Sequence, residues 1–403
     1  MSEWSNYKLD ELGSVGRGKS RHRPRNAPHL YGGGYPFIQT GDVKKANMYI
    51  SEFTQTYSDA GLAQSKLWDK GTLLITIAAN IADVAILDID ACFPDSVIGF
   101  IPNKEICDVK YIKYYFDLFQ KTFQQISQGS TQDNLSVEKL LSLKIPVPPL
   151  LTQQKIAKIL SNYDDLIENN LKRIKLLEES ARLTYEEWFL RFRVDGKRLE
   201  IDPDSGLPFE WQDVLLTDYI DLLRGVEPGS SKYEEVKTDS NIPFIRVGDL
   251  SKRDSDIYVS KDLANNKIID KDDILLSLDG SPGKVRFGLS GCYSTGIRKA
   301  VSKQKNVSSI FIYNLLNSPY IQGLIEAYAT GATILHAGSS VKKMRLVLPT
   351  DEVLDKYNNI EMKKFQLILN LSDENKLLKE ARDILLPRLM TGMIDTDDLD
   401  IAV

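Results

Sequence analysis

The sequence has few of the residues from which metal and redox centres are built. Its three cysteines, Cys92, Cys107 and Cys292, lie far apart in the chain and form no C-x-x-C pair. Only three histidines are present, which argues against a histidine-based metal or catalytic site. Because a disulfide framework or a metal centre needs paired or clustered ligands, we expect buried, reduced thiols and no bound metal.

Long hydrophobic runs are also missing. No apolar run approaches the roughly 20 residues that a membrane-spanning helix needs. The N-terminal stretch MSEWSNYKLD lacks the charged and then apolar segments of a secretion signal. With 42% hydrophobic and 27% charged residues, the chain of 403 residues has an ordinary globular composition and room for two or more domains. We expect a cytoplasmic protein with no membrane partner.

Negative charge is in slight excess, but positive charge is concentrated locally. The formal net charge of −5 argues weakly against a general nucleic-acid coat. From Arg17 to Arg25, however, every charged residue is basic, whereas the C-terminal stretch DTDDLDI is acidic. Each run is compatible with a solvated surface or with a local binding site, and composition leaves both open.

One stretch fits a nucleotide-binding motif. Residues 13–20 read GSVGRGKS, which matches G-x-x-x-x-G-K-[ST]. A phosphate-binding loop of that kind joins a buried strand directly to a helix, but Pro24, Pro28 and three consecutive glycines follow. We therefore expect no helix at this place and no ATP binding.

The sequence repeats itself. YPFIQTGDV, beginning at Tyr35, returns as IPFIRVGDL, beginning at Ile242, which is an offset of 207 residues. The same offset aligns Trp4 with Trp211, and it aligns two Arg-Gly pairs. Three separated matches at one spacing indicate a duplication. In the second copy, GVE aligns with the GKS of the apparent nucleotide motif. The feature that the two copies share is therefore an Arg-Gly turn that ends a strand.

The second part of the repeat is shifted by six residues. KGTLLITIAA at 70–79 aligns with KDDILLSLDG at 271–280, an offset of 201. The new offset persists as far as KLLEE at 175–179 and KLLKE at 376–380. The second copy has therefore lost six residues between these blocks.

Each copy is expected to form a mixed α/β domain followed by a long helix. Short β-branched and aromatic runs, punctuated by Gly, Pro and Asn, fill about 150 residues of each copy. From Thr152, the expected helix cap, to about Phe192 the chain has no Pro or Gly, and none lies between Asp351 and Pro387, where the second helix is expected to end. The predicted parts are a first mixed α/β domain at 1–151, a first long helix at 152–193, a linker and second α/β domain at 194–350, and a second long helix with its tail at 351–403.

Both helices carry apolar residues at heptad-like spacing. The two series are Ile167, Ile174, Ala181 and Trp188, and Leu371, Leu378 and Leu385. Asn375 and Arg382 interrupt the second helix, which favours short coiled-coil contacts over one long zipper. Because duplicated units tend to pack about a pseudo-two-fold axis, we expect two antiparallel helices with one domain at each end. The expected fold class is α+β, and two heads held apart suit duplex DNA, which repeats every ~34–36 Å.

Several segments resemble those of one known family. GSTQDNLS at 129–136, then LKIPVPPLLTQQKIAKIL at 143–160, then a long helix resemble the first half of a Type I restriction–modification specificity subunit. ILLPRLMTGMID at 384–395 resembles that family's C-terminal signature, and IPFIRVGDL and DDILLSLDGSPGKV resemble segments of its target-recognition domains. The resemblance covers essentially the whole chain, twice and in order. The second copy departs from it, with TGATILHAGSS in place of QGSTQDNLS and VLPTDEVLDKY in place of VPPLLTQQKI.

The resemblance implies a subunit with no catalytic activity of its own. Each domain is expected to read one half of a split, asymmetric site on double-stranded DNA. The paired helices are expected to set the unread gap and to dock two modification subunits, which methylate adenines. Restriction subunits that translocate and cut DNA are expected to complete the complex. The resemblance thus places S-adenosylmethionine, ATP and magnesium on partner subunits and no cofactor on this chain.

Loops rich in basic and amide side chains are the candidates for DNA contact, because such groups bind phosphates and base edges. In the first copy the candidates are Arg17, Lys19, Arg21, Arg23, Arg25, Gln39, Lys44, Lys45, Asn47, Thr131, Gln132 and Asn134. In the second copy they are Arg224, Arg246, Lys284, Arg286, Lys342 and Lys343. A single such residue is more often only solvated, and it is their recurrence at equivalent places that favours binding. Asp42 and Asp249 are expected to organise a turn.

Other interpretations of the same features stay open. A protein-binding scaffold can use paired helices and two heads, and a modification-only system can use the same kind of specificity subunit. Intrinsic catalysis is not favoured, because the N-P-P-[FY]-type loop of an amino-methyltransferase is missing. The acids in LSKRDSDIYVSKD at 250–262, the nearest approach to a nuclease motif, have the pattern of turn residues.

Overall fold

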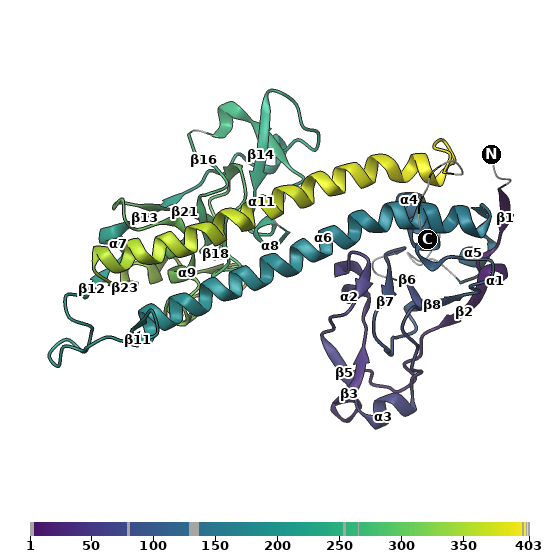
Figure 1. Cartoon of the computed structure of the whole chain (residues 1–403), viewed down its shortest axis with the longest axis horizontal. Helices are drawn as coiled ribbons and strands as arrows, with labels where there is room; N and C mark the ends of the chain where they lie inside the picture. The colour runs from purple at the N-terminus through teal and green to yellow at the C-terminus, as the bar shows by residue number, and fades with distance from the viewer. Residues whose placement is uncertain are drawn as a thin grey trace. The chain divides into compact units, whose positions relative to one another are not determined.

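The chain forms two compact units. The computed structural model describes residues 4–78, 81–128, 137–252, 255–264, 266–396, 399 and 401. Unit 1 comprises Met1–Asn169 and Asn375–Val403, and unit 2 comprises Asn170–Glu374. Each unit therefore combines one copy's domain with helix residues from the other copy (Figure 1).

A five-stranded sheet forms the centre of unit 1, in the order β2-β8-β6-β7-β4. Its strands are β2 (Gly13–Arg17), β4 (Tyr49–Ile50), β6 (Leu73–Thr76), β7 (Val84–Leu87) and β8 (Val97–Pro102). Only β4 and β7 run in parallel; the other pairs are antiparallel. Every residue of β6 is buried, since Leu73 and Ile75 join one hydrophobic cluster and Leu74 joins another on the opposite face.

Shorter elements surround this sheet. The two-stranded sheets of unit 1 pair β1 (Ser5–Tyr7) with β9 (Ile145–Val147) and β3 (Tyr31–Phe37) with β5 (Gln55–Tyr57). The helices around the sheet are α1 (Leu9–Leu12), α2 (Thr40–Lys45), α3 (Asp59–Ala63), α4 (Val109–Gln128), α5 (Val137–Ser142) and the 3-10 turn η1 (Pro28–Leu30).

Unit 2 is built on the same plan. Its main sheet has the order β13-β21-β17-β19, with β13 (Ile220–Arg224), β17 (Ile274–Ser277), β19 (Val285–Arg286) and β21 (Ile297–Ser302). A second sheet has the order β15-β14-β20-β16, with β14 (Asn241–Ile245), β15 (Tyr258–Ser260), β16 (Ile268–Ile269) and β20 (Gly291–Tyr293). Paired strands are β12 (Gln212–Leu215) with β23 (Arg345–Leu348), β18 (Asp279–Gly280) with β22 (Leu335–His336), and β10 (Arg193–Val194) with β11 (Lys197–Arg198). The helices are α7 (Leu216–Tyr219), α8 (Asp249–Lys252), α9 (Ser309–Leu316), α10 (Pro319–Ala327) and the 3-10 turns η3 (Ser230–Lys232), η4 (Lys261–Ala264) and η5 (Gly338–Lys343).

The register of one strand pair in each unit confirms the duplication. Ser5 faces Val147 across β1 and β9 in unit 1, and Gln212 faces Leu348 across β12 and β23 in unit 2. These pairs agree with the offsets of 207 and 201 that the sequence alignment requires. β2 and β13 likewise take equivalent places in the two main sheets.

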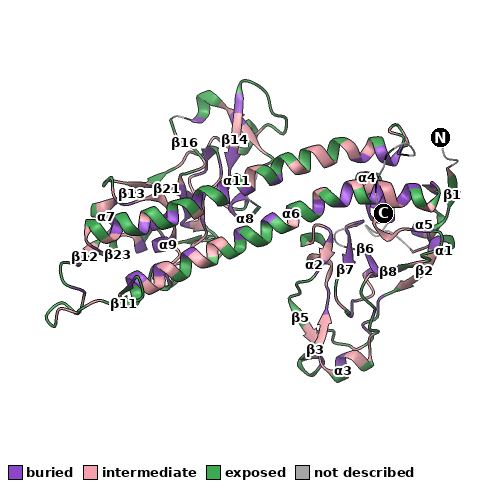
Figure 2. Ribbon diagram, in the orientation of Figure 1, coloured by how far each residue is buried: buried purple, intermediate pink, exposed green. Residues whose placement is uncertain are grey.

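Two long helices contribute residues to both units. α6 spans Leu150–Tyr185 and continues as the π-helical turn Glu186–Leu190, and α11 spans Asp351–Met390. Buried and exposed residues alternate along both helices (Figure 2). The residues Ile167, Ile174, Ala181 and Trp188 are all buried, which confirms the heptad-like series of the first helix.

The helices are antiparallel where they pack within each unit. In unit 1, Lys155 of α6 reaches the Thr396 carbonyl that follows α11, and Asp164 pairs with Arg382. In unit 2, Asn170 bonds Glu374, Ser180 accepts from Lys364, and the Tyr185 ring lies against Tyr357. Partner numbers fall as residue numbers rise, which is the antiparallel order expected from the sequence.

Two predicted helix ends were wrong. α6 begins at Leu150, with the Pro149 carbonyl accepting the Gln153 N–H at 3.0 Å, so Thr152 lies inside the first turn and does not cap it. α11 continues past Pro387 to Met390. Because Pro387 lies in the last turn, its missing N–H costs the helix only one bond, and the buried side chains of Leu389 and Met390 hold that turn in the core.

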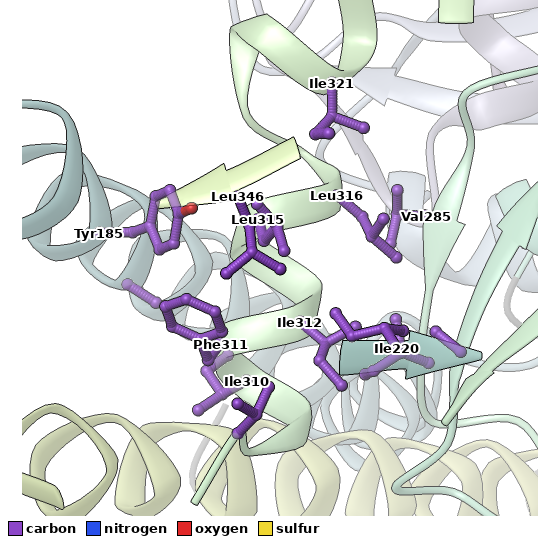
Figure 3. Packing of buried hydrophobic residues seen from close by; sticks show 14 of the residues in the cluster. Tyr185, Ile220, Val285, Ile310, Phe311, Ile312, Leu315, Leu316, Ile321 and Leu346 are labelled. Carbon is purple, nitrogen blue, oxygen red and sulfur yellow. The ribbon is translucent and has the colours of Figure 1, made fainter. Parts of the chain in front are cut away.

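The largest cluster of buried side chains in unit 2 is centred on α9. This helix has the sequence SIFIYNLL. Because most of its faces are apolar, most of them are also buried. Figure 3 shows its side chains between Tyr185 of α6, Ile220 of β13 and Leu346 of β23. The same cluster contains α11 residues, so the β-sheet of unit 2 is fixed to both long helices through one core.

Candidate nucleic-acid interface

A basic loop, residues Arg17–Arg25, leaves the end of β2. Residues 18–27, all of which the structure describes, contain no helix, so the prediction that no helix follows the motif is confirmed. The loop's cations are all exposed: Arg17, Lys19, Arg21, Arg23 and Arg25. Five positive charges without an intervening acid give this loop the chemistry of an anion-binding surface.

Gly18 and Gly225 occupy the same tight place in the two units. A Cβ on Gly18 would lie 2.3 Å from the Pro94 carbonyl oxygen, and one on Gly225 would lie 2.1 Å from the Tyr293 carbonyl oxygen. Any larger residue would push the strand end away from these carbonyls. The interpretation of the Arg-Gly pair as a turn that ends a strand is confirmed.

The arginine of each pair also makes the same contact. Arg17 donates from Nε to the backbone carbonyl of Asp95, and Arg224 donates from Nε to that of Thr295 at 3.3 Å. Each guanidinium thus ties the end of its strand to an equivalent loop. Both arginines remain exposed, so this contact does not remove them from solvent.

Side chains from other segments hold the basic loop in place. Gln64 accepts from the backbone N–H groups of Arg21 at 2.6 Å and His22 at 3.0 Å, and Ser65 donates to the Lys19 carbonyl at 2.8 Å. The Arg25 guanidinium bonds both carboxylate oxygens of Asp95, at 2.9 and 2.8 Å. The loop is therefore fixed before any ligand arrives, which lowers the entropic cost of binding.

Asp42 and Asp249 organise equivalent turns, as the sequence predicted. Asp42 accepts the Gln39 N–H at 2.9 Å, and Asp249 accepts the Arg246 N–H at 2.9 Å. The side chains presented by the two turns differ, since Gln39 donates to Gln55 whereas Arg246 lies against Asp249 itself. The same backbone turn thus presents the amide of Gln39 in unit 1 and the cation of Arg246 in unit 2.

A short segment brings the Gln39 turn and the basic loop together in unit 1. The Cys92 carbonyl accepts the Ile38 N–H at 2.8 Å, and the neighbouring Phe93 carbonyl accepts the Lys19 N–H at 3.0 Å. Lys44 and Lys45 are exposed on α2, directly after the turn. These predicted residues therefore gather around one segment of unit 1.

Other predicted residues are engaged within the protein. The Asn47 amide donates to the buried Asp164 of α6 at 3.2 Å. Arg286 donates to the Leu250 carbonyl at 2.8 Å and lies 3.9 Å from Glu178 of α6. Both side chains support packing, whereas Lys342 and Lys343 in η5 are exposed and Lys284 is half-buried. Thr131, Gln132 and Asn134 lie outside the described residues.

A polar group in unit 2 has no sequence signal. Asp279 bonds the His336 ring at 2.8 Å and the Arg298 guanidinium at 3.3 Å, on the ribbon formed by β18 and β22. Burial lowers the pKa of Arg298, and Asp279 opposes that effect. Residues this far apart in the chain form no motif, so sequence inspection missed them, as it missed Gln64 and Asp95.

The long helices expose apolar residues at equivalent positions. The pairs, each related by the offset of 201, are Leu166 and Leu367, Leu176 and Leu377, and Leu183 and Ile384. Their exposed fractions are 49% and 36%, 69% and 66%, and 45% and 56%. These exposed apolar pairs lie outside the buried heptad series, so the contact between the helices does not explain them.

Two absences hold for the described part of the chain. No group of three or more His, Cys, Asp or Glu side chains there is placed to hold a metal ion. Within the same ranges, no helix combines the length and the apolar character needed to cross a membrane.

Comparisons with known proteins agree with this geometry. The family model of the Type I restriction modification DNA specificity domain matches residues 1–179 and 208–370. The chain is 27% identical to the Type I restriction enzyme MjaIX specificity subunit of Methanocaldococcus jannaschii, over 98% of this chain and 95% of that protein. It is 24% identical to the HindI specificity subunit of Haemophilus influenzae, over 98% and 100%. A crystal structure of the Type I restriction–modification S subunit from M. genitalium shares the fold, with 18% identity, 96% coverage of both chains and a TM-score of 0.57.

Proposed function

The chain belongs to the Type I restriction modification DNA specificity domain family as a specificity subunit, and from this premise we propose that it reads a bipartite, asymmetric site on double-stranded DNA. Residues 1–151 read one half-site and residues 194–350 read the other, while the helices at 152–193 and 351–403 set the unread gap. The observation that carries this proposal is the pairing of like scaffolds with unlike loops. A reader of two different half-sites needs both.

The proposed interface uses the exposed and half-buried candidates in each unit. In unit 1 they are the basic loop, Gln39, Lys44 and Lys45, and in unit 2 they are Arg224, Arg246, Lys284, Lys342 and Lys343. Lysines and arginines position the duplex through its phosphates, while Gln39 and Arg246 have the paired donors or acceptors that read base edges. Asn47 and Arg286 act through the fold in this proposal. Thr131, Gln132 and Asn134 stay predictions.

The exposed apolar pairs support docking of two modification subunits on the helices. Leu176 and Leu183 are two helical turns apart on one face of α6, and Leu377 and Ile384 repeat that spacing on α11. Apolar side chains exposed at the same place in both copies favour two identical partners, because covering them stabilises a complex by about 25 cal/mol per Å². Each helix accordingly offers one copy of the same binding strip.

In this proposal the chain contributes recognition and no catalysis. The modification subunits hold S-adenosylmethionine and methylate adenines, and restriction subunits supply ATP- and magnesium-dependent translocation and cleavage. A modification-only complex is the second candidate, since the same specificity subunit serves it. The relatives are named as subunits of Type I restriction enzymes, which favours the complete system.

The test is to map methylation in DNA from cells that carry this chain with its modification subunits. We expect a split motif with one adenine modified on each strand. Replacing residues 1–151 by the same domain of a relative should change one half of the motif only. Methylation of one continuous short site would contradict two-headed reading. A gel shift at moderate salt that shows no DNA binding by the assembled complex would favour the protein-scaffold alternative.

A further inference from the structure

Asp95 holds the basic loop at both of its ends. Its backbone carbonyl accepts from Arg17, and its carboxylate pairs with Arg25 at 2.8 Å. Within the described residues, it is the only carboxylate that forms an ion pair with the loop. The other cations of the loop, Lys19, Arg21 and Arg23, have no acid bound to their side chains in the same ranges.

The Arg25–Asp95 pair resembles an arginine–phosphate contact. A carboxylate presents oxygens to a guanidinium as a phosphate does. The two side chains are 49% and 35% exposed, so solvent and a ligand can reach them. Water screens an ion pair at such a surface, so the pair contributes little to stability and exchange of the carboxylate for a phosphate is feasible.

The second unit separates the two roles of Asp95. Arg17 pairs with Ile98 across the sheet of unit 1, and Arg224 pairs with Arg298 across the sheet of unit 2. Asp95 and Thr295 each lie three residues before the paired residue, so Thr295 is the equivalent of Asp95 in unit 2. Thr295 keeps the backbone contact, since its carbonyl accepts from Arg224, but it has no carboxylate. The fold therefore needs the carbonyl at this place, whereas the carboxylate is confined to the unit with the basic loop.

We propose that the Asp95 carboxylate is an internal competitor for DNA phosphate that withholds Arg25 from non-specific binding. On non-target DNA, Arg25 stays paired with Asp95 and neutralises no phosphate. At the target, close docking of the whole loop presents a phosphate that displaces the carboxylate. This inference rests on the proposed function, and it makes Asp95 a specificity-determining residue that touches no base.

The test compares salt dependence on two duplexes. The complete complex is titrated with two duplexes of equal length, between about 50 and 200 mM salt. One duplex contains the motif found by the methylation mapping, and the other contains the same bases in scrambled order. Because each neutralised phosphate adds about 0.9 to the slope of log K against log salt, Asp95→Asn should steepen the non-target slope by about 0.9. The target slope should not change. Non-target binding should tighten by about 3–10-fold at the lowest salt.

Three further variants make the result specific. Asp88→Asn removes another exposed carboxylate, paired with Lys70 in the same unit, and should leave both slopes unchanged. Asp95→Thr introduces the residue of unit 2 and should match Asp95→Asn, which guards against a folding defect peculiar to one variant. In an Arg25→Ala background, Asp95→Asn should have no effect.

Failure of the inference and failure of the proposed function give different results. If the wild-type complex prefers the target but the Asp95→Asn non-target slope equals that of wild type, the competitor role is overturned and recognition stands. Persistence of the Asp95→Asn effect without Arg25 also overturns it. A wild-type complex that binds the two duplexes equally removes both proposals.

Discussion

Unit 1 and unit 2 use one backbone plan to present unlike loops. The tight glycine after the strand, the arginine contact to a loop carbonyl and the aspartate that accepts at the turn are the same in both. The loop at 17–25 has five cations and no acid, whereas residues 224–232 contain Arg224, Lys232 and Glu227. Duplication thus kept the residues that shape the backbone and left the displayed side chains to vary.

The helix pair differs between the units in its buried chemistry. Asp164 is fully buried in unit 1, where it binds Arg382, Tyr114 at 2.5 Å and Asn47. Burial next to this carboxylate raises the pKa of Tyr114. At the equivalent positions, 201 residues away, unit 2 has Phe365 and Ala181, both buried. One position therefore carries an ion pair in unit 1 and apolar packing in unit 2.

The largest effect is expected from breaking that ion pair. Asp164→Ala removes the main partner of Arg382, whose side chain is only 16% exposed, and should lower the free energy of unfolding by about 3–5 kcal/mol. Denaturant unfolding of the full chain measures the loss. The double variant Asp164→Ala/Arg382→Ala should recover part of this lost free energy. The losses caused by Phe365→Ala and Arg382→Ala should be additive when the two are combined. If the measured coupling energy between Asp164 and Arg382 is zero, the proposed contrast between the units is contradicted.

Next in size is loss of the basic loop's charges. Replacing Arg21, Arg23 and Arg25 by alanine should weaken DNA binding about 10–100-fold and flatten the salt slope by about 2–3. The matched control replaces Arg193, Lys197 and Arg198, three exposed cations of the β10–β11 hairpin. Fluorescence anisotropy against salt separates the two triples. An unchanged slope in the first triple would exclude this loop from the interface.

The glycines should show that the two units share their scaffold. Gly18→Ala and Gly225→Ala each force a Cβ against a carbonyl oxygen, and each should cost about 1–3 kcal/mol of stability. Thermal unfolding checks the cost, with Gly34→Ala, where a Cβ meets no atom within 4 Å, as the control. A large effect in one unit alone would contradict their equivalence at this turn.

The smallest predicted difference concerns the thiols. Burial raises the pKa of Cys107 to about 12 and that of Cys292 to about 11. Because only the thiolate reacts, and a higher pKa leaves a smaller thiolate fraction, Cys107 should be alkylated more slowly than Cys292 at pH 8. Mass spectrometry after iodoacetamide treatment gives both rates, with urea-unfolded protein as the reference. Equal rates in the folded chain would contradict the prediction.

Much of the fold could be predicted because its signals are local or periodic. The repeat offsets, the helices free of Pro and Gly, the Arg-Gly turn and the aspartate turns are visible in the sequence, and the structure confirms them. The start of α6 was missed because Thr152 is a common capping residue, whereas here Pro149 supplies the first helical acceptor. Local preference is a weak guide where a preceding strand fixes the entry of the chain.

The candidate site could be predicted only in outline. Basic residues of the loop were found by composition, but the partners that fix them, Gln64 and Asp95, come from segments about 40–80 residues away. Such contacts depend on tertiary packing and leave no spacing to detect. For the same reason Arg286, predicted to face DNA, was not expected to bond the Leu250 carbonyl.

The exchange of helix ends between the copies also orders events during synthesis on the ribosome. The core of unit 1 contains Leu386, Leu389 and Met390 beside Ile156 and Leu160, whereas unit 2 is one continuous stretch that is complete at Glu374. As translation proceeds from the N-terminus, the nascent first unit emerges early and must wait, partly open, for the last helix. The domain made first is thus the last that can close its core.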